Sequence, residues 1–211
     1  MELMTGFGLA TAAGLNAYIP LLLMGLLGRF TSLITLPPGW SWLENGWVLA
    51  IVAVLLVVEV VADKIPALDS VNDAVQTFVR PTSGGIVFGS GTAAQTAAVT
   101  DPADFARTGA WVPVAIGVVT ALVVHLTTTT VRPAANVATP AANVATAGVA
   151  APVLSTIEDV TSVGLTFIAI LIPALVLLVL IALIWAAVRL LRRRPRRRPL
   201  RRADVNHPET P

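Results

Sequence analysis

Two uncharged apolar runs constrain this chain more than any other feature. Residues 3–28 and residues 163–188 contain no charged side chain, and each run exceeds the roughly 20 residues that a helix needs to cross the hydrocarbon core of a bilayer. Of the 211 residues, 55% are hydrophobic and 12% are charged. The mean hydropathy is +0.80, far above that of a soluble domain. The sequence therefore predicts an all-α integral membrane protein in which each run crosses the bilayer once.

Further segments can also cross. Residues 46–62 are apolar except for Glu59, and residues 109–131 are apolar except for His125 and a threonine cluster. Residues 83–99 are rich in small side chains, which suits a helix packed against neighbours, so this segment either spans or enters and returns. Residues 132–159 contain the tandem unit AANVATP and AANVATA; its prolines favour a broken or re-entrant segment, and a local duplication in a tolerant loop is the alternative.

These segments predict a polytopic helix bundle with four to six crossings and one or two irregular or re-entrant segments, around residues 63–83 and 132–159. The motif VRP occurs in both halves, which suggests a weak two-fold internal repeat of about residues 46–100 and 109–188. We expect residues 1–188 to form the transmembrane domain.

Arginine dominates the C-terminal end. Nine of the 14 basic residues fall within residues 189–202, directly after the last apolar run. Such a cluster predicts a disordered tail, residues 189–211, that is held in the cytoplasm and attracts anionic lipid headgroups. The tail has no interleaved aromatic residues and no nucleic-acid-binding motif, so no nucleic-acid partner is expected. The lipid bilayer is the expected partner, and assembly into a homo-oligomer stays open.

An unusual group of charges follows the second apolar segment, in VEVVADKIPALDSVNDAVQTFVRP, residues 58–81. Glu59 and Asp63 are four residues apart, so both side chains lie on one helix face. After Pro66, apolar residues recur at helical spacing, and the opposite stripe is polar. That stripe contains Asp69, Asp73, Gln76 and Arg80.

Two interpretations of this stretch stay open. In the first, it is a surface helix whose carboxylates lie in water and pair with Lys64 or Arg80. In the second, the carboxylates line a hydrated cavity inside the membrane and bind a cation or relay protons. Ionisable groups within a bilayer tend to face such a pathway and to pair with one another, which favours the second interpretation for Glu59.

The remaining polar residues of the apolar segments supply candidate partners. His125 could carry protons or serve only as a buried structural side chain. Ser155 and Glu158 fit a helix-capping box, and an amide within the first span, at Asn16, needs a partner. The candidate ion- or solute-binding residues are Asn16, Glu59, Asp63, Lys64, Asp69, Asp73, Arg80, His125, Glu158 and Asp159.

Cofactor and catalytic signatures are poor. The chain has no cysteine, which rules out disulfides and thiolate metal sites. Its oxygen ligands would favour Mg²⁺, Ca²⁺ or Na⁺ over zinc, but no ligand motif is present and no cofactor is expected. The FGSGT sequence around Ser90 lacks the nucleophile elbow of serine hydrolases. We therefore assign no catalytic residue and do not expect an enzyme.

Three stretches carry a family resemblance: AAGLNAYIPLLLMGLLGRF (residues 12–30), the charged stretch 58–81, and PVLSTIEDV (residues 152–160). They resemble the bacterial integral-membrane family catalogued as domain of unknown function 4126. The resemblance implies a bacterial cytoplasmic membrane location and marks the ten candidates, together with Pro66 and Ser155, as matching positions. Family members carry a lysine shortly after the histidine, whereas this chain has HLTTTTVR, which puts a cationic role there in doubt.

We expect a small transporter or channel for a cation or a proton-coupled small polar solute. In this hypothesis Glu59 and Asp63 bind the coupling ion, and Lys64 and Arg80 balance charge. A non-transporting scaffold or lipid-interacting protein is the alternative, because buried polar pairs also lock helices together. Intramembrane hydrolysis through Ser90 is a third, weaker hypothesis. Water access to the carboxylates distinguishes the first two.

Overall fold

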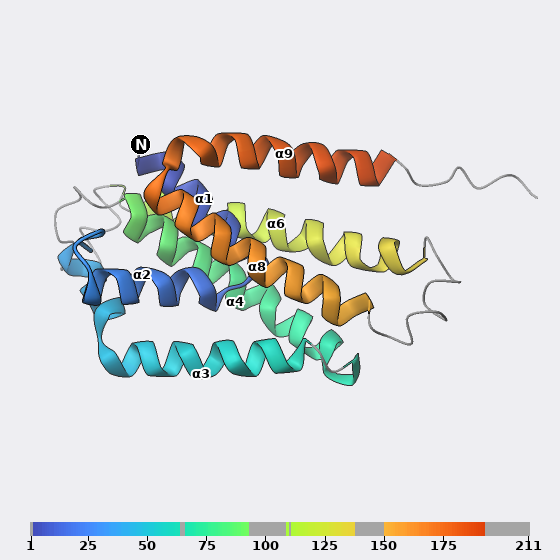
Figure 1. Cartoon of the computed structure of the whole chain (residues 1–211), viewed down its shortest axis with the longest axis horizontal. Coiled ribbons are helices and arrows are strands. Elements are labelled where there is room, and N and C mark those ends of the chain that lie inside the picture. The colour runs from blue at the N-terminus through green and yellow to red at the C-terminus, as the bar shows by residue number, and fades with distance from the viewer. Residues whose placement is uncertain (1, 64–65, 93–108, 110, 138–149, 193–211) are drawn as a thin grey trace, which may run out of the picture.

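Every regular element in the described part of the chain is a helix, which confirms the predicted all-α class there. The computed structural model describes residues 2–63, 66–92, 109, 111–137 and 150–192. The elements are α1 (Glu2–Leu15), α2 (Tyr18–Phe30), the 3₁₀ helix η1 (Pro38–Glu44), α3 (Gly46–Ala62), α4 (Pro66–Thr92), α6 (Trp111–Val137), α8 (Ala150–Leu171) and α9 (Pro173–Arg192). Figure 1 shows them as an elongated bundle.

Two of the described helices are long and apolar enough to cross a membrane. They comprise Trp111–Thr130 of α6 and Val153–Leu171 of α8. The pair formed by η1 and α3, bent by 60°, makes a third candidate. A membrane protein is therefore consistent with the structure, and the number of crossings stays a prediction.

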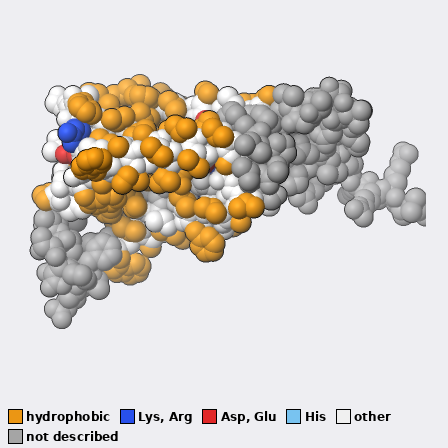
Figure 2. Space-filling model, turned by 90° about the horizontal axis from the view of Figure 1, so that it is seen from below, with side chains coloured by type: hydrophobic (Ala, Val, Ile, Leu, Met, Phe, Trp, Pro, Cys, Tyr) orange, Lys and Arg blue, Asp and Glu red, His pale blue; other side chains and the backbone are white. Residues whose placement is uncertain are grey.

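The outer surface is strongly apolar. Trp47 is 81% exposed and Phe78 is 78% exposed. In α3 the buried residues are Leu49 and Glu59, while most of its valines and leucines face outward. Figure 2 shows hydrophobic side chains spread over the face seen from below. An apolar surface of this extent suits contact with lipid, because exposed apolar patches on soluble monomers are much smaller.

The first apolar run does not form one crossing, so that prediction is wrong. Helix α1 has 14 residues and α2 has 13, which makes each about 20 Å long, shorter than the roughly 30 Å hydrocarbon core. Figure 1 shows the chain turning back between Leu15 and Tyr18, so that α2 ends on the side where α1 begins. The two helices form a hairpin whose tip lies inside the bundle.

The last apolar run is also divided. Helix α8 begins at Ala150 and ends at Leu171, and α9 begins at Pro173. Because proline has no backbone N–H, it cannot continue the hydrogen-bond ladder of α8. Figure 1 shows α9 running back beside the bundle. Residues 163–188 therefore hold the turn between two helices and are not a single span.

Helix α4 corrects a third expectation. It is one continuous helix from Pro66 to Thr92, with Pro81 inside it, where an irregular stretch up to residue 83 was expected. The predicted irregular stretch 132–159 is helical at both ends, because α6 extends to Val137 and α8 starts at Ala150. Residues 138–149, within the duplicated unit, lie outside the described residues, as does most of the arginine-rich tail.

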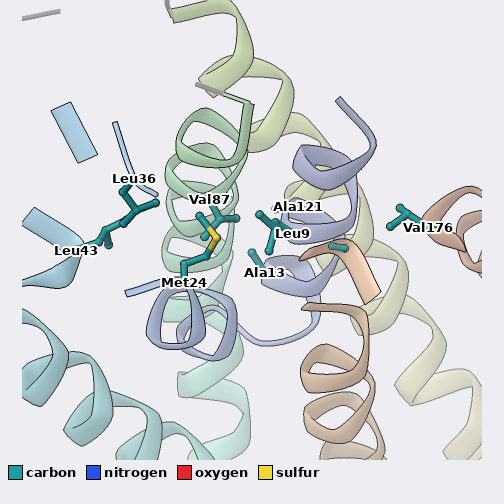
Figure 3. Packing of buried hydrophobic residues seen from close by; sticks show 9 residues of the cluster. Leu9, Ala13, Met24, Leu36, Leu43, Val87, Ala121 and Val176 are labelled. Carbon is teal, nitrogen blue, oxygen red and sulfur yellow. The ribbon is translucent and has the colours of Figure 1, made fainter. Parts of the chain in front are cut away.

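Glycines let α4 and α6 pack closely. A Cβ atom added at Gly84 would lie 2.3 Å from the Ala121 Cβ and 2.7 Å from the Gly117 carbonyl oxygen. Small residues allow such close approach between membrane helices. Helix α1 packs against α4, α6, α8 and α9, and Figure 3 shows Leu9 and Ala13 beside Ala121 in this core. The hairpin tip is thereby held in the middle of the bundle.

Candidate functional site: a buried polar cluster

The guanidinium of Arg80, in the middle of α4, connects four other elements. Arg80 is 1% exposed. Its Nη2 donates to Glu59 Oε1 of α3 at 3.3 Å, and its Nη1 lies 3.8 Å from Glu158 Oε2 of α8. Nη1 also donates to the Gly14 carbonyl oxygen of α1 at 3.3 Å and lies 3.4 Å from His125 Nδ1 of α6. Arg80, Glu59, Glu158 and His125 are called the Arg80 cluster below.

The contacts of His125 define its tautomer. Arginine is only a donor, so Nδ1 of His125 faces Arg80 as an acceptor. The ring proton then belongs on Nε2, which lies 3.1 Å from Thr77 Oγ1. The Thr77 hydroxyl in turn donates to the Asp73 carbonyl oxygen at 2.9 Å. His125 is fully buried and joins the cluster as a neutral ring, since both nitrogens of a charged ring would be donors.

A second network surrounds Asp63, just after α3. Its Oδ1 accepts a hydrogen bond from the Asn72 amide of α4, and its Oδ2 accepts one from the Ser155 hydroxyl of α8 at 3.0 Å. The capping-box prediction for Ser155 and Glu158 is therefore wrong, because α8 starts at Ala150 and both residues lie within it. Their side chains instead tie α8 to α3 and α4.

Asn16 has the polar partner that its position in the apolar run predicted, and it also organises the hairpin tip, which the sequence did not predict. Its Nδ2 donates to Asp159 Oδ1 at 2.9 Å, and its Oδ1 accepts from the backbone N–H groups of Tyr18 and Ile19 at 3.0 and 3.1 Å. The side chain thus satisfies the start of α2, whose first N–H groups have no partner within the helix.

Side chains of other helices satisfy the carbonyl groups at the tip. Gly14 accepts from Arg80, Ala17 accepts from the Ser83 hydroxyl, and Ala12 accepts from the Ser162 hydroxyl at 3.0 Å. Irregular backbone within a membrane is tolerated only where its polar groups find such partners. The helix break and the polar residues around it are therefore one structural unit.

The polar stripe of α4 points inward. Gln76 and Arg80 are 1% exposed, whereas Val75 is 50% exposed and Phe78 is 78% exposed. Along this part of α4 the apolar side chains form the outer face and the polar side chains the inner face. The surface-helix interpretation is therefore wrong for Arg80, which is buried, whereas for Asp73, which is half-buried, both interpretations stay open.

Most of the predicted site residues come together at the hairpin tip. Asp73 is half-buried, while Lys64 and the side chain of Asp69 lie outside the described residues. Ser90 donates to the Val87 carbonyl oxygen of its own helix at 3.3 Å, and the contacts of His125 described above do not include it. Besides Ser155, the list of candidate residues left out six residues of the networks: Tyr18, Asn72, Gln76, Thr77, Ser83 and Ser162.

A signal was available for two of these. Gln76 falls four residues before Arg80, on the same helix face, and Tyr18 follows Asn16 by two residues. The Tyr18 side chain interacts with Gln76, Glu59 and Arg80. Tyr18 is the single tyrosine in the chain.

Three buried atoms of this region have no hydrogen-bond partner in the described part of the chain: Glu59 Oε2, Gln76 Oε1 and Arg80 Nε. An unpaired buried polar atom costs roughly 1–3 kcal/mol. Carboxylates also outnumber the guanidinium. Glu59 interacts electrostatically with the carboxylates of Asp63 and Asp159 as well as with Arg80. Among the described residues, no group of three or more His, Asp or Glu side chains could hold a metal ion.

The fold and the cluster define a class: a helical protein whose helices can span a membrane and which buries ion pairs among them. The chain belongs to the family described as "Domain of unknown function (DUF4126)", whose model matches residues 3–193. This confirms the resemblance seen in the sequence. No curated protein and no solved structure matches the chain.

Proposed function

We propose that this protein is a small transporter or channel of the bacterial cytoplasmic membrane, for a cation or a proton-coupled small polar solute. The observation that carries the proposal is the Arg80 cluster at the tip of a broken helix pair. An ionisable side chain at the centre of a bilayer costs about 2.5 kcal/mol or more, so such groups usually serve a pathway.

The broken helix pair supports the same function. Secondary transporters commonly bind substrate near the bilayer midplane, where discontinuous helices present half-helix ends and unwound carbonyls. Here α1 ends at Leu15 and α2 begins at Tyr18, and Arg80 contacts the Gly14 carbonyl at the end of α1. The side chains of the Arg80 cluster come from α3, α4, α6 and α8, so movement of one helix against the others would change the cluster.

The arrangement suggests a topology within the predicted four to six crossings. We propose five crossings, by α3, α4, α6, α8 and α9, with the α1–α2 hairpin entering from the side opposite the C-terminus (Figure 1). Helix α4 has 27 residues and α9 has 20, and both are long enough to span. The arginine-rich tail would place the C-terminus in the cytoplasm and the N-terminus outside.

A scaffold is the second candidate, and one observation favours it. Asp63 is paired on both oxygens, by Asn72 and Ser155, and Asn16 is paired with Asp159. Hydrogen bonds between membrane helices stabilise packing by about 0.6 kcal/mol each on average. A protein that only needs its helices locked together would keep these networks dry.

Water access tests the two candidates. Because the chain lacks cysteine, single cysteines can replace Gln76, on the inner face of α4, and Phe78, on the outer face, as a matched pair. In sealed membrane vesicles, a membrane-impermeant thiol reagent should label Gln76→Cys and leave Phe78→Cys unlabelled. Labelling at neither position would favour the scaffold. Labelling at Phe78→Cys would mean that the outer face of α4 meets water, against the membrane placement.

Flux then tests transport itself. In proteoliposomes loaded with pH-, Na⁺- or K⁺-sensitive dyes, Glu59→Gln should abolish any flux that the wild-type protein supports. Glu2→Gln is the matched control, because it makes the same substitution at an exposed position. Equal flux in the wild-type protein and Glu59→Gln would remove Glu59 from the pathway.

A further inference from the structure

Two unpaired atoms of the Arg80 cluster, together with one atom of Gln76, indicate which ion the site takes. We infer that the site takes a proton in preference to a metal cation, that the Glu59 carboxylate carries it, and that water held between Glu59, Gln76 and Arg80 delivers it. This inference rests on the proposed transport function and deepens it. Its basis is the geometry of one ion pair.

The ion pair between Arg80 and Glu59 contains one of the two hydrogen bonds that it could form. In a guanidinium the Nε–H and one Nη–H point along the same edge, so a carboxylate can accept two parallel hydrogen bonds there. Glu59 Oε1 accepts from Nη2 at 3.3 Å, but Glu59 Oε2 and Arg80 Nε have no partner among the described residues. One donor and one acceptor of the same pair are thus open, although both residues are at most 2% exposed.

The third unpaired atom completes a site for water. Gln76 Oε1 lies one helical turn before Arg80, on the same face of α4, and is an acceptor without a partner in the described chain. A molecule that fits must donate to two acceptors and accept from one donor. Water does so, whereas a bare metal cation cannot accept a hydrogen bond from Nε. A buried water usually makes about three hydrogen bonds, which is the number available here.

A metal cation at Glu59 is disfavoured on two further grounds. Na⁺, Mg²⁺ or Ca²⁺ needs several oxygen ligands within about 2.6 Å, and no group of three or more acidic or histidine side chains in the described residues is placed to hold a metal. The Arg80 guanidinium would also repel a second cation beside its carboxylate partner. A proton needs only one lone pair, and Glu59 Oε2 has one available.

The charges around Glu59 fit proton exchange. Glu59 interacts electrostatically with Arg80 of α4, Asp63 just after α3, Asp159 of α8 and the Tyr18 phenol of α2. Glu158 of α8 and His125 of α6 contact Nη1 of Arg80, whereas Glu59 contacts Nη2. The water would give one proton to Glu59 Oε2 as it takes another from the solution side: one O–H bond of the water breaks, one O–H bond forms at Oε2, and the incoming proton restores the water. The guanidinium would then pair more closely with Glu158, because neutral Glu59 no longer attracts it.

Infrared spectroscopy of the protein in liposomes tests this inference. The C=O stretch of a protonated carboxyl group, identified by ¹³C-labelled glutamate, is followed as the pH is lowered in choline chloride, NaCl or KCl. We expect one buried glutamate band that grows as the pH falls, moves in D₂O, disappears in Glu59→Gln and persists in Glu2→Gln. Glu59→Asp keeps a carboxyl group, so a titrating band should remain, at a new frequency. Because the label is in glutamate and not in aspartate, ¹³C labelling of glutamate should not shift that band.

Two results would overturn the inference. If the titration midpoint moved to lower pH by up to about one unit for each tenfold rise in Na⁺ or K⁺, a metal cation would compete at the same site. If the folded wild-type protein showed no titrating buried glutamate, or if the band survived in Glu59→Gln, Glu59 would not carry the proton. Either result leaves cation or solute transport to be decided separately by the labelling and flux experiments.

Discussion

Replacing Arg80 with methionine tests whether the cluster is held by charge. Methionine keeps the unbranched apolar part of the side chain but removes the guanidinium. Glu59 and Glu158 would lose their shared cation, and the Gly14 carbonyl would lose its side-chain donor. Arg80 is 1% exposed and Glu59 is 2% exposed, so bulk solvent does little to screen the carboxylates that lose their cation.

The expected loss of stability can be built up from these contacts. Removing one partner of a buried ion pair costs roughly 3–5 kcal/mol, because the other charge is left uncompensated. The unpaired carbonyl adds roughly 1 kcal/mol or more. We expect Arg80→Met to lower the free energy of unfolding by about 4 kcal/mol or more near neutral pH. Protonation of Glu59 removes its uncompensated charge in the folded state, so the loss should shrink as the pH falls.

The assay is unfolding by SDS in mixed micelles, followed by circular dichroism at two pH values. Arg29→Met is the matched control, because Arg29 is exposed and its Nη1 donates to the carbonyl oxygen of Glu44, at the end of η1, at 2.7 Å. This variant should cost only about 1 kcal/mol. Adding Glu59→Gln to Arg80→Met should recover part of the loss, by roughly 0.5–3 kcal/mol. The reasoning fails if Arg80→Met costs no more than the control, or if the double variant is less stable than Arg80→Met alone.

Three further predictions concern packing, the hairpin tip and topology. Gly84→Ala should destabilise the protein by about 1–3 kcal/mol through a clash with α6. At Gly164 an added Cβ meets nothing within 4 Å, so Gly164→Ala should stabilise the protein by roughly 0.5–1 kcal/mol. SDS unfolding measures both variants, and equal effects would contradict the close packing of α4 against α6. Asn16→Leu removes three hydrogen bonds and should cost about 3 kcal/mol, so a neutral result in the same assay would mean that the hairpin tip does not depend on it. In intact cells an impermeant thiol reagent should label Ser41→Cys in η1 and reach Thr210→Cys in the tail only after permeabilisation; the reverse pattern would invert the proposed topology.

The inner face of the site was predictable because it follows from periodicity. Polar residues recur at helical spacing opposite a stripe of apolar residues, at Asp73, Gln76 and Arg80. Charged side chains within membrane segments almost always face the interior of the bundle. Glu59 stood out as the one charge in its apolar segment. These local patterns identified the polar stripe of α4, and the structure shows that Gln76 and Arg80 of this stripe are buried.

The break at Asn16 was not predictable in the same way. The residues on either side, Leu15 and Ala17, suit a continuous helix, and what stabilises the break comes from Arg80, Ser83 and Asp159, far along the chain. Likewise Ser155 and Glu158 match a capping pattern, but α8 starts before them because its neighbours supply partners for both side chains. Tertiary contacts override local signals at both places.

The central position of α1 has a consequence for the order of assembly. Helix α1 leaves the ribosome before α4, α6, α8 and α9, yet it packs against all four of them. Helices α1 and α2 are each too short to cross the bilayer alone. The side chains that hydrogen-bond the backbone and Asn16 at the break lie on later helices. The hairpin therefore cannot reach its final place until those helices have been inserted. The protein therefore completes its centre last, and truncation before α8 should leave the N-terminal hairpin without a stable position.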